Sequence, residues 1–187
     1  MRKKDNFGTL RIIGGRWRGR KLKVPPVEEV RPTTDMLRET LFNWLSPIIQ
    51  GAHCLDLFAG SGALGFEALS RGAACVTFID SSPEVVKQLE ETALHLGATA
   101  EILHADACSA WESKNKPFHL VFLDPPFHQN LIEPACAFLD SHDILCKNAY
   151  IYLETEGGFD SLPTPSHWHV IREKKQGQVS AYLIWRE

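Results

Sequence analysis

Short apolar segments alternate with helical segments along the chain, and this alternation restricts the fold more than any other feature. Five segments are rich in β-branched, aromatic and other apolar residues, which predicts buried strands over 53–58, 74–79, 100–103, 118–123 and 150–153. Apolar residues at helical spacing predict helices over 34–46, 63–71, 83–96 and 129–140. Strands that alternate with helices form a doubly wound, mostly parallel α/β sheet. The segments 167–174 and 179–185 flank Gly177 and predict an antiparallel C-terminal hairpin at the edge of this sheet.

A glycine-rich loop follows the first of these strands. Gly60-Ser-Gly62-Ala-Leu-Gly65 fits the pattern G-x-G-x-x-G between a strand and a helix, and Asp80 lies twenty residues after Gly60. This spacing is typical of dinucleotide-binding sites, so a nicotinamide-dependent oxidoreductase is one hypothesis. Asp56 favours another, because a carboxylate at the mouth of the loop repels a pyrophosphate. It attracts a sulfonium and an α-ammonium group, and S-adenosylmethionine carries both.

Four successive strand ends bear an acidic residue, and ligands of such sheets bind at the carboxyl ends of the strands. In a methyltransferase with a Rossmann-like fold of class I, the loop backbone approaches the cofactor because glycine has no Cβ. Asp80 would accept hydrogen bonds from the ribose hydroxyls, and Asp106 with the backbone of Ala107 would meet the adenine edge. The candidate cofactor-binding residues are Asp56, Phe58, Ala59, Gly60, Ser61, Gly62, Asp80, Ser81, Asp106 and Ala107. The structural alternative is that these residues bind no ligand. The loop would then be only a tight turn between strand and helix, and the acids would be helix caps or surface charges.

The segment Asp124-Pro125-Pro126-Phe127 ends the fourth strand and supplies the candidate catalytic residues. Two consecutive prolines cannot continue a buried strand, so they stop it and fix the backbone. The Asp124 carboxylate and the Pro125 carbonyl then stand as two acceptors side by side, which suits the exocyclic amine of a nucleobase. Phe127 offers a face on which the base can stack. The structural alternative is a Pro-Pro turn in which Asp124 is an ordinary turn former.

The charge of the chain is unevenly distributed. Residues 1–31 carry ten Lys and Arg against three acids, whereas the net charge of the whole chain is −3. A basic segment on an acidic body suggests a polyanionic partner. Residues 9–13 and 21–24 look like short strands, so we expect a small basic β-hairpin over 1–31 and a methyltransferase domain over 32–187. A solvated, disordered basic tail is the alternative.

Several classes of protein do not fit the sequence. No apolar run approaches the roughly 18 residues of a membrane helix, and the N-terminus lacks the apolar stretch of a signal peptide. The five cysteines contain no C-x-x-C, so we expect reduced thiols in a cytoplasmic protein. His167 and His169 have no evident third ligand, so we expect no metal site. We also expect a monomer.

Taken together, these motifs resemble the RsmD family, from about Leu10 to Trp185. The resemblance rests on the glycine loop, on Asp-Pro-Pro-Phe, and on Arg11-Ile-Ile-Gly-Gly15, Arg18-Gly-Arg20, Arg31-Pro-Thr33 and Arg38-Glu-x-Leu-Phe42. It implies S-adenosylmethionine-dependent methylation of the 2-amino group of one guanine in bacterial small-subunit ribosomal RNA. The candidate RNA-binding residues are Arg11, Arg16, Trp17, Arg18, Arg20, Lys21, Arg31, Thr33 and Arg38.

Three alternatives stay open at this point. Adenine poses the same hydrogen-bonding problem as guanine, so an adenine amino-methyltransferase acting on DNA is possible. The others are the oxidoreductase and a non-catalytic RNA-binding module, against which the intact Asp-Pro-Pro-Phe segment argues. The sequence shows departures from the family pattern at Asp80, where Glu is common, and at Phe127, where Tyr is frequent.

Overall fold

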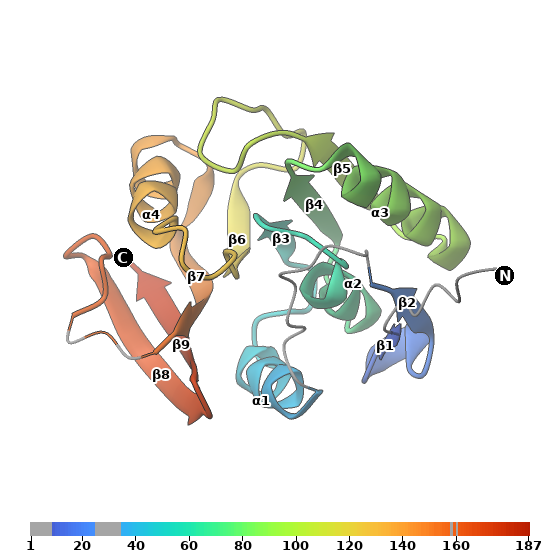
Figure 1. The fold of residues 1–187 in the computed structure, drawn as a ribbon, viewed down its shortest axis with the longest axis horizontal. Helices are drawn as coiled ribbons and strands as arrows, with labels where there is room; N and C mark the ends of the chain where they lie inside the picture. Colours follow the sequence, from blue (N-terminus) through green and yellow to red (C-terminus); the bar gives the residue numbers. More distant parts are fainter. Residues whose placement is uncertain (1–8, 25–34, 158, 160) are drawn as a thin grey trace, which may run out of the picture.

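A seven-stranded sheet forms the centre of the structure, a computed structural model that describes residues 9–24, 35–157, 159 and 161–187. The strand order is β5-β4-β3-β6-β7-β9-β8 (Figure 1). Strands β3 to β7 pair in parallel, and β9 and β8 continue the sheet antiparallel. The strands span His53–Asp56 (β3), Cys75–Asp80 (β4), Ala100–His104 (β5), Phe118–Leu123 (β6), Leu145–Glu156 (β7), Trp168–Gln176 (β8) and Val179–Arg186 (β9). The predicted doubly wound sheet with a C-terminal hairpin is confirmed.

Helices cover both faces of this sheet (Figure 1). On one face, helices α1, α2 and α3 pack their apolar side chains against buried residues of β3, β4, β6 and β7. On the other face, α4 packs against the opposite side chains of β3, β6 and β7. The helices span Asp35–Leu45 (α1), Ala63–Ser70 (α2), Pro83–Leu96 (α3) and Ile132–Ser141 (α4).

The chain changes direction across the sheet at β3. From β3 it proceeds through β4 to the edge strand β5, and it then returns to β6 on the other side of β3. The carboxyl ends of β3 and β6 therefore flank a topological switch point, where sheets of this kind leave a crevice for ligands.

Two strands near the N-terminus form a separate antiparallel hairpin, β1 (Thr9–Arg11) and β2 (Lys21–Lys23), connected through a short 3-10 helix at Gly15–Trp17. Ile12 and Leu22 are buried and belong to the same apolar cluster as α1 and α2. The hairpin thus shares its core with the sheet. The division into domains at residue 31 stays a prediction, because residues 25–34 lie outside the described part of the chain.

Strand β7 is longer than its sequence suggests, since it begins at Leu145 rather than near Tyr150. Its register against β6 shifts between Phe118 and Leu120, and Asn148 adopts a left-handed conformation in this region. The polar residues of this irregular segment hide the strand from periodicity, because an irregularity breaks the alternation of faces.

Candidate functional site

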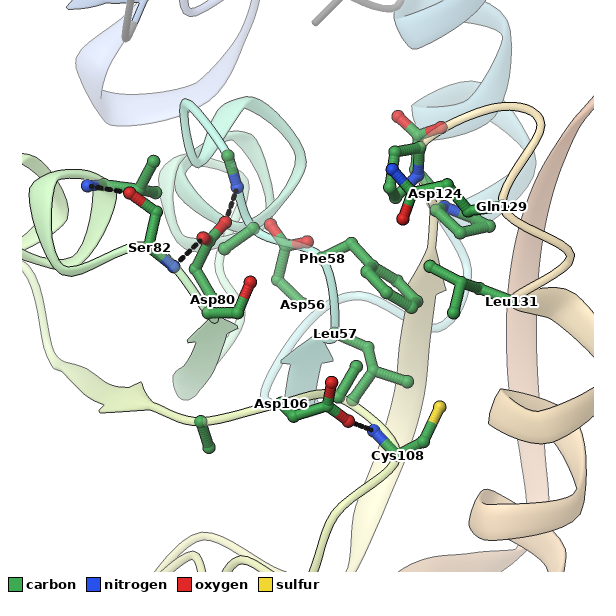
Figure 2. A pocket seen from close by; sticks show the side chains of 18 of the residues that line it. Asp56, Leu57, Phe58, Asp80, Ser82, Asp106, Cys108, Asp124, Gln129 and Leu131 are labelled. Carbon is green, nitrogen blue, oxygen red and sulfur yellow. Dashed lines mark hydrogen bonds between the residues drawn. The ribbon is translucent and has the colours of Figure 1, made fainter. Parts of the chain in front are cut away.

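A cavity of about 460 Å³ opens at the carboxyl ends of β3, β4, β5 and β6. All four strand-end acids predicted from the sequence line it: Asp56, Asp80, Asp106 and Asp124. Figure 2 shows Asp56 and Asp80 on one side of this space and Asp124 on the other. The cavity therefore joins the glycine-loop end and the Asp-Pro-Pro-Phe end in one site.

Asp56 is a buried acid, with 2 % of its surface exposed. Its Oδ2 accepts a hydrogen bond of 3.0 Å from the backbone N–H of Gly65 in the first turn of α2. Burial raises the pKa of Asp56 to about 8, the Gly65 hydrogen bond opposes this shift, and the charge of Asp80 adds to it. Among the described residues no cation pairs with this buried carboxyl, which suits a ligand that brings positive charge.

Asp80 holds two backbone segments in place. Its Oδ2 accepts from the N–H of Gly60 at 2.9 Å, and its Oδ1 accepts from the N–H of Ser82 at 2.9 Å. Ser82 in turn caps α3, because its Oγ accepts from the N–H of Val85 at 3.3 Å. Each oxygen of a carboxylate has a further acceptor position, so Asp80 can still receive ligand hydroxyls.

The glycines of the loop have different roles. Gly60 has a left-handed φ of 49°, and a Cβ on it would meet no atom within 4 Å, since it faces open space. Gly62 is also left-handed, but its Cβ would lie 2.6 Å from Phe66 and 2.7 Å from Leu89. Gly62 does not line the cavity. Its lack of a Cβ serves the packing of α2 and α3, whereas Gly60 leaves room for a ligand.

The other predicted cofactor residues also reach the cavity, which is lined by Phe58, Ala59, Ser61, Ser81, Asp106 and Ala107. Asp106 is exposed, and its Oδ1 accepts from the N–H of Cys108 at 2.9 Å. The carbonyl of Ala107 accepts from the indole of Trp111 at 3.2 Å. A role for Trp111 that the sequence did not indicate is therefore to hold this loop.

The segment from Asp124 to Phe127 lines the opposite end of the cavity. Pro125 is buried, while Asp124 and Phe127 are half-buried and so remain accessible to a ligand. On the neighbouring strand β7 the hydroxyl of Tyr152 donates to Glu154 at 2.7 Å. Burial raises the pKa of Tyr152, and the charges of Glu154 and Asp124 raise it further. Asp124 therefore lies close enough to Tyr152 for its charge to act on the phenol.

The N-terminal hairpin is fastened to α2 by a buried glutamate. The carboxylate of Glu67 accepts from the N–H of Ile13 at 2.7 Å, from the N–H of Gly14 at 2.8 Å and from Arg71 at 2.6 Å. Ser70 adds two bonds, because it accepts from Trp17 N–H and donates to the carbonyl of Gly14. The sequence did not indicate Glu67, whose position on a helix resembles that of any surface acid.

Most basic residues of the hairpin are available to a partner. Arg11, Arg16, Arg18, Arg20 and Lys21 are exposed. The guanidinium of Arg16 lies 4.1 Å from the ring centroid of the half-buried Trp17.

Arg38 corrects the prediction made for it. Its side chain is 0 % exposed, and it donates to the carbonyl of Arg11 at 2.9 Å and to Asp35 at 2.6 Å. A side chain that solvent does not reach cannot contact RNA in this conformation, so Arg38 joins the hairpin to α1. Arg31 and Thr33 lie outside the described residues.

The cavity is also lined by residues that sequence reasoning missed, namely Leu57, Ala63, Leu64, Ser82, Val85, Ala105, Cys108, Gln129, Leu131 and Pro134. Gln129 and Leu131 follow Asp-Pro-Pro-Phe closely, and this proximity was the available signal. Over the described part of the chain, no group of three or more His, Cys, Asp or Glu is arranged to hold a metal. None of the described helices is long and apolar enough to cross a membrane.

Comparison with known proteins places this chain among methyltransferases. The family described as conserved hypothetical protein 95 matches residues 10–185. The ribosomal RNA small subunit methyltransferase D of Escherichia coli is 48% identical over 191 residues, which cover 100% of this chain and 96% of that protein. A solved putative methyltransferase of Escherichia coli has a TM-score of 0.85 at 48% identity, over 96% of this chain and 99% of the other. A 16S rRNA N2 methyltransferase of Thermus thermophilus, solved with AdoMet and guanosine, shares the fold: its TM-score is 0.74 at 20% identity, over 97% of this chain and 50% of the other.

Proposed function

The chain belongs to the family of conserved hypothetical protein 95, the RsmD family, and on that premise we propose that it methylates the 2-amino group of one guanine in small-subunit ribosomal RNA. S-adenosylmethionine is the proposed methyl donor. The observation that carries the proposal is the single cavity in which Asp56 and Gly60 stand at one end and Asp124 to Phe127 at the other. Such a cavity holds a cofactor and a base together, as transfer between them requires.

The glycine-loop end fits this cofactor. The open space beside Gly60 admits a ligand close to the backbone, and the buried Asp56 lacks a positive partner among the described residues. In the proposal Asp56 complements the cationic amino-acid end, Asp80 accepts the ribose hydroxyls, and Asp106 with Ala107 borders the adenine. When bound, the cofactor supplies an electrophilic methyl group.

The opposite end fits a nucleobase amine. The Asp124 carboxylate and the Pro125 carbonyl would accept the two hydrogens of the amine, which withdraws its lone pair from the ring and directs it toward the methyl group. Phe127 would stack on the base, a contact worth about 1–3 kcal/mol. The catalytic contribution of these residues is mainly alignment, which supplies up to about 7–11 kcal/mol in well-oriented systems. Asp124 also stands ready to accept the proton that the amine loses after transfer.

The exposed arginine and lysine side chains of the N-terminal hairpin would bind the RNA backbone. Arg16, Arg18, Arg20 and Lys21 lie on one short hairpin that is anchored to Glu67 and Ser70 of α2. Phosphates attract such a cluster strongly, and the acidic remainder of the chain would repel them. Trp17 could stack on an unpaired base. We propose that the protein acts as a monomer in the cytoplasm, where the small subunit is found.

Mass spectrometry of small-subunit ribosomal RNA nucleosides tests the proposal directly. We expect a strain without this gene to lose one N2-methylguanosine, which the wild-type gene restores and an Asp124→Ala gene does not. Loss of N6-methyladenosine instead would assign the enzyme to adenine. An unchanged nucleoside profile would contradict the proposal.

A further inference from the structure

Gln129 stands out at the base-binding end of the cavity. The cavity wall there is formed by residues of the segment 124–134, namely Asp124, Pro125, Pro126, Phe127, Gln129, Leu131 and Pro134. Within this described wall, Gln129 is the one side chain that can donate a hydrogen bond, because an ionised Asp only accepts. Two contacts to the amine leave the rest of the Watson–Crick edge without a partner, and Gln129 is available to supply one.

The Gln129 side chain is free to engage a ligand. It is exposed and lines the cavity, and Figure 2 shows it beside Asp124. None of the residues that the structure describes forms a hydrogen bond with its amide. A polar side chain that faces a cavity without a partner there is a candidate for ligand recognition.

The backbone around Gln129 has a defined conformation. The residues on both sides are left-handed, with φ of 63° at His128 and 52° at Asn130. Nε2 of His128 lies 2.9 Å from Oε2 of Glu156 at the end of β7, and α4 begins directly afterwards at Ile132. Non-glycine residues with positive φ persist where the surrounding structure holds them, and they concentrate at ligand sites. This loop therefore places the backbone of Gln129 at the edge of the cavity, from which its side chain can reach a ligand.

An amide distinguishes the two purines when their amine is already held. Next to the 2-amino group of guanine come N1–H, a donor, and then O6, an acceptor. The carbonyl of a glutamine can accept from N1–H while its NH₂ donates to O6, which gives two hydrogen bonds. Next to the 6-amino group of adenine come N1, an acceptor, and then C2–H, so only one conventional bond is available. The second bond favours guanine.

We propose that Gln129 reads the N1–H and O6 edge of the target base and selects guanine over adenine. This inference rests on the proposed function, because it assumes that Asp124 and Pro125 hold the 2-amino group. It adds a specificity residue that lies beyond the Asp-Pro-Pro-Phe segment, and it supplies the discrimination that this segment by itself lacks.

Base substitution in the RNA separates recognition from folding. The substrates are two ribosomal RNA fragments with guanine or 2-aminopurine at the nucleotide that mass spectrometry identifies. The analogue retains the 2-amino group but lacks O6 and N1–H. The measurement is the single-turnover rate at saturating S-adenosylmethionine and subsaturating RNA. We expect wild-type protein to prefer guanine by about tenfold. Gln129→Met should lose this preference by slowing the guanine reaction more than the 2-aminopurine reaction, because guanine loses two hydrogen bonds and the analogue loses one.

Gln178→Met is the matched control, because Gln178 is exposed in the turn between β8 and β9, away from the cavity lining. It should keep the wild-type preference. Equal loss of both reactions in Gln129→Met, or an undiminished preference for guanine, would overturn the inference while leaving the proposed function intact. Wild-type protein that methylates neither RNA would overturn both.

Discussion

At the scale of single residues, the carboxyl of Asp56 links cofactor binding to pH. Its pKa is 3.8 in an unperturbed chain and about 8 in the folded protein, mainly because of burial. The folded state therefore binds this proton more tightly than the unfolded state. The stability contributed by the protonated carboxyl is fully present below about pH 4 and is lost as pH rises through about 8. A cationic ligand has the opposite preference, since it favours the ionised carboxylate.

The affinity for S-adenosylmethionine should therefore rise with pH and level off above about pH 8. Below that point we expect a change of up to about tenfold per pH unit, because one proton must leave Asp56 on binding. Asp56→Asn should bind weakly and lose this component of the pH dependence. Calorimetry between pH 6 and 9 measures both effects.

The same variant controls for folding. The amide that Asp56→Asn introduces needs no proton, and its carbonyl can still accept from the N–H of Gly65. Asp56→Asn should therefore melt no lower than wild type at pH 8. A wild-type affinity that does not change with pH would contradict the assignment of Asp56 to the cationic end.

Asp124 should affect the transfer step and leave cofactor binding unchanged. We expect Asp124→Ala to bind S-adenosylmethionine normally and to transfer methyl at least about 100-fold more slowly, since alignment and charge contributions of this kind are worth a few kcal/mol. Phe127→Tyr should retain activity because its stacking face survives, whereas Phe127→Ala should not. Single-turnover rates of methyl transfer, measured for the three variants at saturating cofactor, test these expectations. A normal rate in Asp124→Ala would show that the segment 124–127 is a structural turn without a catalytic role.

At the scale of elements, the loop between β3 and α2 combines two uses of glycine. Gly60 faces the cavity, and Gly62 packs against Phe66 and Leu89. Both have positive φ, so replacement by alanine strains the two positions similarly, by about 1–2 kcal/mol. A comparison of alanine variants at the two positions therefore distinguishes an effect on the ligand space from an effect on packing.

We expect Gly60→Ala to lower cofactor affinity by at least about tenfold with only this modest loss of stability, because its methyl enters the ligand space. Gly62→Ala should lose a further amount of about 1–3 kcal/mol, since its methyl overlaps two side chains. Denaturant unfolding and calorimetry on both variants provide the comparison. Equal stability of the two would show that the overlap at Gly62 is relieved by movement of α2 or α3.

The position of the N-terminal hairpin depends on its hydrogen bonds to Glu67 of α2. Glu67→Ala removes the acceptor of two hairpin N–H groups and of Arg71, so we expect a loss of about 3 kcal/mol in the free energy of unfolding. Glu39→Ala is the matched control, because Glu39 is exposed on α1, and it should change stability by less than about 0.5 kcal/mol. Hydrogen exchange at Ile13 and Gly14 should accelerate in the Glu67 variant. Unchanged exchange there would contradict the role of Glu67 as the anchor.

At the scale of the whole molecule, charge and architecture are coupled. The basic hairpin shares its core with α1 and α2 through Ile12 and Leu22, so deletion of residues 1–24 would open that core as well as remove charge. Reversal of exposed charges is the cleaner experiment, because it leaves every buried contact in place.

Reversing Arg16, Arg18 and Lys21 together should weaken RNA binding and leave S-adenosylmethionine affinity unchanged. If each contacts a phosphate, the log–log dependence of RNA affinity on salt should become shallower by about 2, since each contact with a single strand contributes about 0.7. Filter binding over a range of salt concentrations measures this slope. A slope and an affinity equal to those of wild type would exclude these residues from the RNA-binding surface.

The sequence by itself determined the order of elements and the strand-end residues that line the cavity. Helical and strand periodicity, the cap at Ser82 and the double proline after Asp124 are local signals, and local signals do not depend on the partner against which a segment packs. Because parallel strands end at one edge of a sheet, Asp56, Asp80, Asp106 and Asp124 could be expected to converge.

Only the tertiary structure decided which side chains are buried, which are exposed and what each one contacts. In the sequence Arg38 resembles a basic side chain that binds RNA, yet in the structure it is buried against the hairpin. Glu67 resembles a surface acid, yet it anchors that hairpin. Gly62 belongs to the loop motif but serves packing, whereas Gln129 carries no motif and lines the cavity. Burial is produced by segments that are distant in sequence. The exposure of a side chain, and the pKa of a carboxyl such as Asp56, therefore emerge only when these segments meet.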